Sequence, residues 1–150
     1  MEEKPSKSSS SPIKEPDEGI GTMKLRHVAL ICRSEEKADW FYQRLLGLKK
    51  LERKTLSAEL SQILFNINDP LTVLHYVSDA LHFEIFILDG HGAPISPIAH
   101  VCLEVSDLDA FLKQCKTMNI PLLRAPKGND WITFIRDDDG NLFEIKETQA

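Results

Sequence analysis

The chain has 150 residues, which is enough for one domain with a good core or for two very small modules that share one. Apolar residues make up 42% and charged residues 27%, as is ordinary for a globular protein. A formal net charge of −5 and the lack of a dense basic run argue against a nucleic-acid surface. No apolar stretch approaches the roughly 20 residues that span a bilayer, so we expect no membrane partner.

Residues 1–22 differ in composition from the rest of the chain. They are mostly Lys, Glu, Ser and Pro, with a serine run at residues 8–11 and no apolar core of the signal-peptide type. We predict a disordered tail or an added extension here, followed by a single domain over residues 23–150. The three cysteines form no Cys-x-x-Cys pair, which favours a reducing, cytoplasmic location over a disulfide framework.

The domain opens with a strand pattern at residues 27–34. Ser34 then precedes two glutamates, which is typical of a helix start. We expect this helix to end at Gly47, because glycine tolerates the left-handed backbone of a C-terminal cap, and the apolar Leu48 follows as such a cap prefers. One face of the helix is apolar and should pack on the sheet. It carries Ala38, Phe41, Tyr42, Leu45 and Leu46.

Three more strands are predicted in the first half, at about residues 49–55, 72–77 and 81–88. The segment between the first two of them, residues 56–69, is an extra piece that the second half of the chain lacks. We predict that it forms a short helix over the open side of the sheet.

The second half repeats this order of elements. Residues 100–107 align with residues 27–34, and Ser106 with Asp109 has the spacing of a capping box. The following helix has an apolar face and is expected to end at Asn119. Its apolar face comprises Leu108, Phe111, Leu112, Cys115 and Met118. Strands are expected after it at residues 122–125, 131–136 and 142–146.

These patterns predict an α+β fold built from two βαβββ modules, at about residues 24–90 and 97–147. The two modules should form a curved mixed sheet with the helices outside. Strand alternation places every second side chain under the helix and turns the others to the opposite, concave face.

Four polar residues occur inside short apolar runs of this pattern, namely His27, Glu84, His100 and Glu144. Alternation puts all four on the concave face. A buried carboxylate without a partner costs several kcal/mol, so each needs a cation or a donor nearby. One divalent metal is a partner that two imidazoles and two carboxylates can share. Taken singly, each residue is better explained by a buried hydrogen bond.

The arrangement resembles the vicinal oxygen chelate superfamily, which contains glyoxalase I, the fosfomycin-resistance proteins, the bleomycin-resistance proteins and the extradiol dioxygenases. The resemblance covers about residues 25–147. It rests on His27 in the first strand, on the helix end Leu46-Gly47-Leu48, and on the second module's opening at residues 100–105. Its most diagnostic part is the strand, turn and strand of residues 134–144, which ends at Glu144.

The resemblance implies that the four polar residues are the metal ligands, since that superfamily draws one ligand from the first and last strands of each module. Taken with their symmetric positions, it favours a metal site over four separate hydrogen bonds. The ligand set is most similar to that of bacterial glyoxalase I. Ile31, however, stands where glyoxalase I usually has an arginine that grips a glutathione carboxylate, which argues against glutathione as the substrate.

The activity implied is that of a metal-dependent lyase or isomerase of the glyoxalase type. It would stabilise an enediolate formed from a small α-oxygenated carbonyl or thioester, with Glu84 or Glu144 as the catalytic base. One Ni, Co, Zn, Mn or Fe ion is expected per site. Two alternatives remain open: an Fe(II)-dependent dioxygenase that uses His27, His100 and Glu144, and a non-catalytic protein that binds a small molecule. We expect a homodimer, whose site lies within one chain or across two.

Several other residues are weaker candidates for a role in substrate binding. His82 is the best of the remaining histidines, ahead of His75 and His91, because it can share a face with Glu84. Arg124 and Lys127 could hold an anionic substrate group. The run Asp137–Asn141 could be a calcium loop, but a hairpin turn explains it better, because the glycine of a calcium loop would fall at Leu142.

Overall fold

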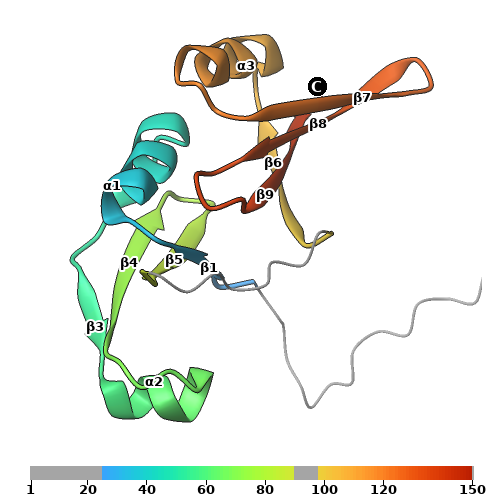
Figure 1. Cartoon of the computed structure of the whole chain (residues 1–150). Helices are drawn as coiled ribbons and strands as arrows, with labels where there is room; N and C mark the ends of the chain where they lie inside the picture. The colour runs from blue at the N-terminus through green and yellow to red at the C-terminus, as the bar shows by residue number, and fades with distance from the viewer. Residues whose placement is uncertain (1–24, 90–97, 150) are drawn as a thin grey trace, which may run out of the picture.

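The computed structural model describes residues 25–89 and 98–149 (Figure 1). The predicted tail, His91 and the junction between the modules lie outside these residues. The first module comprises β1 (Val28–Cys32), α1 (Glu35–Ala38), η1 (Asp39–Leu45), β2 (Lys49–Lys50), β3 (Lys54–Leu56), α2 (Ala58–Phe65), β4 (Leu71–Val77) and β5 (His82–Ile87). The second comprises β6 (His100–Val105), α3 (Leu108–Thr117), β7 (Leu122–Lys127), β8 (Asp130–Arg136) and β9 (Leu142–Glu147).

The strands form one mixed sheet in each module. The order is β1-β5-β4-β2 in the first sheet, with β3 also on β4, and β6-β9-β8-β7 in the second. In each module the strands that come first and last along the chain are parallel neighbours, β1 with β5 and β6 with β9. The α+β class and the two-module plan are therefore confirmed. The strand predicted at residues 49–55 is in fact two pieces, because Glu52 and Arg53 leave the ladder while Leu51 still donates to the His75 carbonyl.

The predicted helices are present, with two local differences. Beyond α1 the first helix widens into a π-helical segment, in which the Leu46 amide donates to the Phe41 carbonyl five residues back. The second helix is capped by Asp107, which accepts from the Ala110 amide at 2.9 Å, so the predicted cap at Ser106 is wrong by one residue. Asp caps as well as Ser, and spacing alone does not separate such neighbours.

Both predicted helix ends are confirmed. Gly47 has a φ of +68° and Asn119 a φ of +55°, which is the left-handed backbone that such caps require. The extra segment also forms the predicted short helix, α2, capped by Ser57 at its start and ended by the left-handed Asn66. No helix of the described residues is long and apolar enough to cross a membrane.

One hydrophobic core serves both modules. Phe143 of β9 lies at its centre, with ring centroids 5.0 Å from Phe41 and 6.0 Å from Phe83. The helix-facing sides of the two sheets therefore pack toward each other, and their other faces point outward. The core residues of both modules include Cys32, Phe41, Tyr42, Leu74, Tyr76, Phe83, Ile85, Leu103, Cys115, Met118, Ile135, Phe143 and Ile145.

The β8–β9 hairpin ties the modules together through a buried carboxylate, that of Asp137. It is 4% exposed and accepts five hydrogen bonds, from Tyr42 Oη, Cys32 Sγ, Asn141 Nδ2 and the amides of Asp139 and Asn141. Gly140 takes the positive φ of the turn, +84°. The run Asp137–Asn141 is thus the predicted hairpin turn. The carboxylate of its first residue, Asp137, accepts its hydrogen bonds from groups of the protein.

Candidate functional site

The first predicted pair of ligands lies together on the open face of the first sheet. His27 stands just before β1, and Glu84 is in β5, the parallel neighbour of β1. His27 Nε2 lies 3.3 Å from Glu84 Oε2, and the two side chains are 36% and 19% exposed. Phe83 and Ile85, on either side of Glu84 in the chain, are buried in the core. Strand alternation thus places this pair as predicted.

The second module repeats the arrangement with His100 and Glu144, whose Nε2 and Oε2 atoms are 3.5 Å apart. His100 Nδ1 lies 2.7 Å from the Ile98 carbonyl oxygen. Because a carbonyl only accepts, this nitrogen carries a proton, and in the neutral imidazole the lone pair is on Nε2, which faces Glu144. An Nδ1–H held by a backbone carbonyl is the usual second contact of a histidine whose Nε2 binds a metal.

The spacing within each pair fits a shared ion. Two ligand atoms that are each about 2.1 Å from an ion lie about 3.0 Å apart at a right angle and about 3.4 Å apart at a tetrahedral angle. The observed separations of 3.3 and 3.5 Å are close to this range. Nitrogen and carboxylate oxygen without sulfur suit Mn, Fe, Co, Ni or Zn. Each pair therefore has the spacing and chemistry of half the ligands of a metal site. We call His27 with Glu84 the first half-site, and His100 with Glu144 the second.

One chain does not bring the two halves together. Within residues 25–89 and 98–149, the only three potential ligands that lie within 4.8 Å of one another are Cys32, Asp137 and Asp139. Those three belong to the group of contacts around the buried Asp137 that joins the modules, which we call the Asp137 clamp. There Asp139 also accepts a hydrogen bond from Arg33 Nε at 2.8 Å. Because the core-facing sides of the two sheets pack against each other, each His–Glu pair lies on the outer face of its own sheet.

Two further histidines join the first half-site. His75 Nδ1 and His82 Nε2 are 2.8 Å apart, and the His82 ring lies 5.6 Å from that of His27. His75 is the partner of Glu84 across the β4–β5 ladder. Burial lowers the pKa of His75. The sequence pointed to His82 but ranked His75 lower, because the register that pairs β4 with β5 is a property of the folded sheet.

Arg124 and Lys127 are both in β7, in the sheet that carries the second half-site, but on opposite faces of it. They line, together with Glu144, a groove of about 1010 Å³ over β7, β8 and β9. Arg124 Nε donates to Thr133 Oγ1 at 3.2 Å, and its guanidinium lies 5.4 Å from the Trp131 ring. Across the β7–β8 ladder Arg124 pairs with the buried Thr133, so its side chain lies on the helix-facing side of the sheet, whereas Lys127 shares the open face with Glu144. The structure thus leaves Lys127 as the predicted cation on the face of the second ligand pair.

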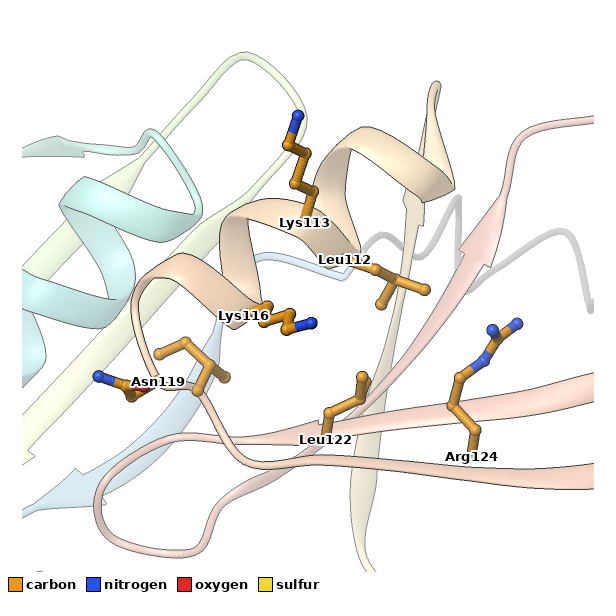
Figure 2. A pocket seen from close by; sticks show the side chains of 7 residues that line it. Leu112, Lys113, Lys116, Asn119, Leu122 and Arg124 are labelled. Atoms are coloured by element: carbon orange, nitrogen blue, oxygen red, sulfur yellow. The ribbon is translucent and has the colours of Figure 1, made fainter.

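A separate hollow of about 590 Å³ lies between α3 and β7. In Figure 2, Leu112 and Leu122 point toward each other across it, and Lys116 and Arg124 extend from its two sides. None of the four predicted metal ligands lines this hollow. Arg124 is the residue that it shares with the groove at Glu144.

Comparison with known proteins identifies the family and the fold. The family described as the glyoxalase/bleomycin resistance protein/dioxygenase superfamily matches residues 24–145. Searching the curated proteins by sequence gives no significant match.

Solved structures of low sequence identity share the fold. A glyoxalase family protein from Enterococcus faecalis is 21% identical, with a TM-score of 0.62 over 81% of this chain and 95% of its own. The fosfomycin resistance protein FosX from Listeria monocytogenes, in complex with Mn(II) and sulfate, is 16% identical, with a TM-score of 0.62 over 86% and 95%. The trypanothione-dependent glyoxalase I of Leishmania major is 16% identical, with a TM-score of 0.60 over 84% and 87%. The chain belongs to the glyoxalase/bleomycin resistance protein/dioxygenase superfamily.

Proposed function

We propose that this protein is a metal-dependent lyase or isomerase that acts on a small α-oxygenated carbonyl compound or thioester. The observation that carries the proposal is the duplicated His–Glu pair, found in both modules at nearly the same spacing and on the same face of the sheet. A dioxygenase site of three ligands would leave Glu84 outside the metal shell, although it is placed like Glu144. The geometry therefore favours four protein ligands around one divalent ion.

We further propose that a second copy of the chain completes each site. In this homodimer, His27 and Glu84 of one copy face His100 and Glu144 of the other, because within one copy the pairs look outward on different faces. Exposed apolar side chains beside both half-sites support such a contact. They are Leu60, Ile63 and Leu64 on α2, and Leu123 on β7, which pairs with Phe134 on the face that carries Glu144.

The side chains divide the chemistry in a simple way. A bound divalent ion would supply Lewis-acid polarisation of two neighbouring substrate oxygens. Glu84 or Glu144 would accept, at a carboxylate oxygen, the proton of the carbon next to the carbonyl. The same carboxyl group would then return the proton to the neighbouring carbon in an isomerase, or to the departing product in a lyase. His100 keeps Nε2 directed into the site through the contact of its Nδ1 with the Ile98 carbonyl. Lys127 shares the open face and the groove with Glu144 and would hold an anionic substrate group.

The proposed site can be tested by subunit mixing. One double variant, His27→Ala with Glu84→Ala, disables the first half-site, and a second, His100→Ala with Glu144→Ala, disables the other. In a dimer whose sites span two chains, a mixed pair holds one intact site, so an equal mixture that is unfolded and refolded together should regain about a quarter of the wild-type metal. Elemental analysis of the desalted protein measures this. The same mixture without refolding is the control.

Each outcome of the mixing experiment separates two proposals. Recovered metal supports a site that two chains share. No recovered metal, while the wild type treated in the same way binds one ion per chain, places all four ligands in one chain and overturns the shared site. A wild type without metal after reconstitution overturns the metal-dependent function. Loss of the substrate α-proton into D2O, followed by NMR over a panel of hydroxycarbonyls and thioesters, then tests catalysis. Glu84→Gln and Glu144→Gln identify the base.

A further inference from the structure

A cavity of about 520 Å³ adjoins the first half-site, between α2 and the open face of the first sheet. Small-molecule sites usually measure about 300 to 1,000 Å³ and have apolar walls with a few polar groups at one place. This cavity fits that description. Its walls include Ala29, Ile31, Phe65, Ile67 and Phe86, and in the part of the chain that the structure describes the only polar side chains that line it are His27 and Glu84.

The cavity has one wall that is particular to the first module. Phe65, the last residue of α2, contacts Phe86 of β5 edge to face, with ring centroids 5.3 Å apart. Phe65 is still 49% exposed, so an occupant would cover apolar surface that is now in contact with water. In the second module β7 runs directly into β8, with Lys127 opposite Asp130, and no helix covers the corresponding face.

The lining also constrains the chemistry of the occupant. Among residues 25–89 and 98–149, no Lys or Arg lines the cavity, so this part of the chain offers no partner to a charged carboxylate tail. Ile31, two residues beyond Ala29 on β1, shares the open face with His27, and its apolar side chain is part of the wall. A group bound here gains free energy by leaving water, whereas any polar end must lie at the rim beside His27 and Glu84.

We propose that the cavity is a specificity subsite for an apolar alkyl or aryl substituent carried by the substrate. Its ligand is an amphipathic molecule whose two neighbouring oxygens would bind the divalent ion that His27 and Glu84 help to hold, and whose uncharged chain or ring lies between Phe65, Phe86 and Ile31. This inference rests on the proposed function, because the metal site is what places the oxygens at the rim. It adds the substrate class, which excludes hydrophilic peptide-like substituents at this position.

Hydroxamic acids are suitable probes, since they present two neighbouring oxygens to a metal and are available with different tails. Binding of acetohydroxamate, butanohydroxamate and hexanohydroxamate to the Mn(II)-loaded wild-type protein is measured by calorimetry. Each methylene that leaves water should tighten binding about threefold to fourfold, so hexanohydroxamate should bind about 100-fold more tightly than acetohydroxamate. A hexanohydroxamate with a terminal carboxylate should lose most of this gain, because the cavity has no cation.

Two variants of α2 locate the effect. Phe65→Ser should weaken hexanohydroxamate at least about tenfold while leaving acetohydroxamate unchanged, because only the longer tail reaches the phenyl ring. Glu59→Ser is the control: Glu59 is exposed on the same helix, does not line the cavity, and should affect neither probe. Both positions are exposed enough for the variants to fold, and thermal melting verifies that they do.

The results distinguish this inference from the function on which it rests. If no hydroxamate binds and the protein takes up no Mn(II), the proposed function fails. If all three bind with one affinity, the metal site stands and the apolar subsite is overturned. The same conclusion follows if chain length matters but Phe65→Ser has no effect, since the tail then lies elsewhere, for example against the second copy of the chain.

Discussion

The two modules share one plan, but their open faces differ. Glu84 and Glu144 occupy equivalent places, yet across the antiparallel ladder Glu84 pairs with His75, whereas Glu144 pairs with Phe134. The residue two before each glutamate differs in the same way, being His82 in one module and Leu142 in the other. An apolar cavity under α2 adjoins the first pair, and a groove with Lys127 adjoins the second.

This difference shows which positions the duplicated fold constrains. The helix-facing side chains of both modules enter one core, so they remain apolar in both halves. The His–Glu pairs are also kept in both. Under the proposed function the positions around them can differ between the modules, because each half-site would recognise only its own part of a ligand. Joined in one site, the two faces would offer an apolar wall on one side and a cation, that of Lys127, on the other.

The core between the modules should respond most strongly to mutation. Phe143 is fully buried and contacts rings of both modules, so Phe143→Ala should lower the free energy of unfolding by about 3 to 5 kcal/mol. Phe134→Ala, on the open face of the same sheet, should lower it by less than half as much. Urea denaturation measures both. If the first variant does not fold, Phe143→Leu should still show a loss of about 1 to 2 kcal/mol. Equal losses at the two positions would contradict the shared core.

The Asp137 clamp comes next in size. Asp137→Ala leaves the Tyr42 hydroxyl and the Asn141 side-chain amide without their buried acceptor, and should lower the free energy of unfolding by about 2 to 4 kcal/mol. Asp138→Ala is the control, since the Asp138 side chain is 53% exposed and its ion pair with Lys37 Nζ is long, at 3.9 Å. It should change stability by less than about 0.5 kcal/mol. The urea curves would refute the clamp if both variants lost the same amount.

The same carboxyl predicts a pH effect. Burial is the main cause that raises the pKa of Asp137 above its ordinary value of about 3.9. The folded protein therefore binds this proton more tightly than the unfolded chain, so its contribution to stability is full below about pH 4 and is lost as the pH rises through the folded pKa. The wild-type advantage over Asp137→Ala in urea should accordingly be larger at pH 4 than at pH 7. An advantage that grows with pH would show that the five donors outweigh burial.

Much of this structure could be predicted from local patterns. Alternation along single strands placed His27 beside Glu84 and His100 beside Glu144, because adjacent parallel strands with known core faces leave only one face for these residues. Gly47 and Asn119 likewise ended their helices as expected. These features depend on a few neighbouring residues and on backbone geometry alone.

The rest depends on contacts between distant parts of the chain. Cys32 and Asp137 are 105 residues apart in sequence, and nothing near either of them indicates that they meet. The way the modules pack, back to back through Phe143, decides that one chain holds two separate half-sites, and a strand pattern does not contain that information. His75 joined the first half-site through the register of β4 on β5, which is set by the whole sheet.

The smallest expected effect concerns this last difference between the modules. His75 bonds to His82 and not to either atom of the His27–Glu84 contact, so His75→Phe, which copies the second module, should weaken Mn(II) binding by less than about tenfold. Glu84→Ala, which removes a ligand, should weaken it by more than about 100-fold. The reciprocal Phe134→His variant tests whether an imidazole beside Glu144 adds affinity, and calorimetric titration compares all three. A loss from His75→Phe as large as that from Glu84→Ala would make His75 a metal ligand. The two half-sites would then differ in how they bind the ion as well as in what surrounds it.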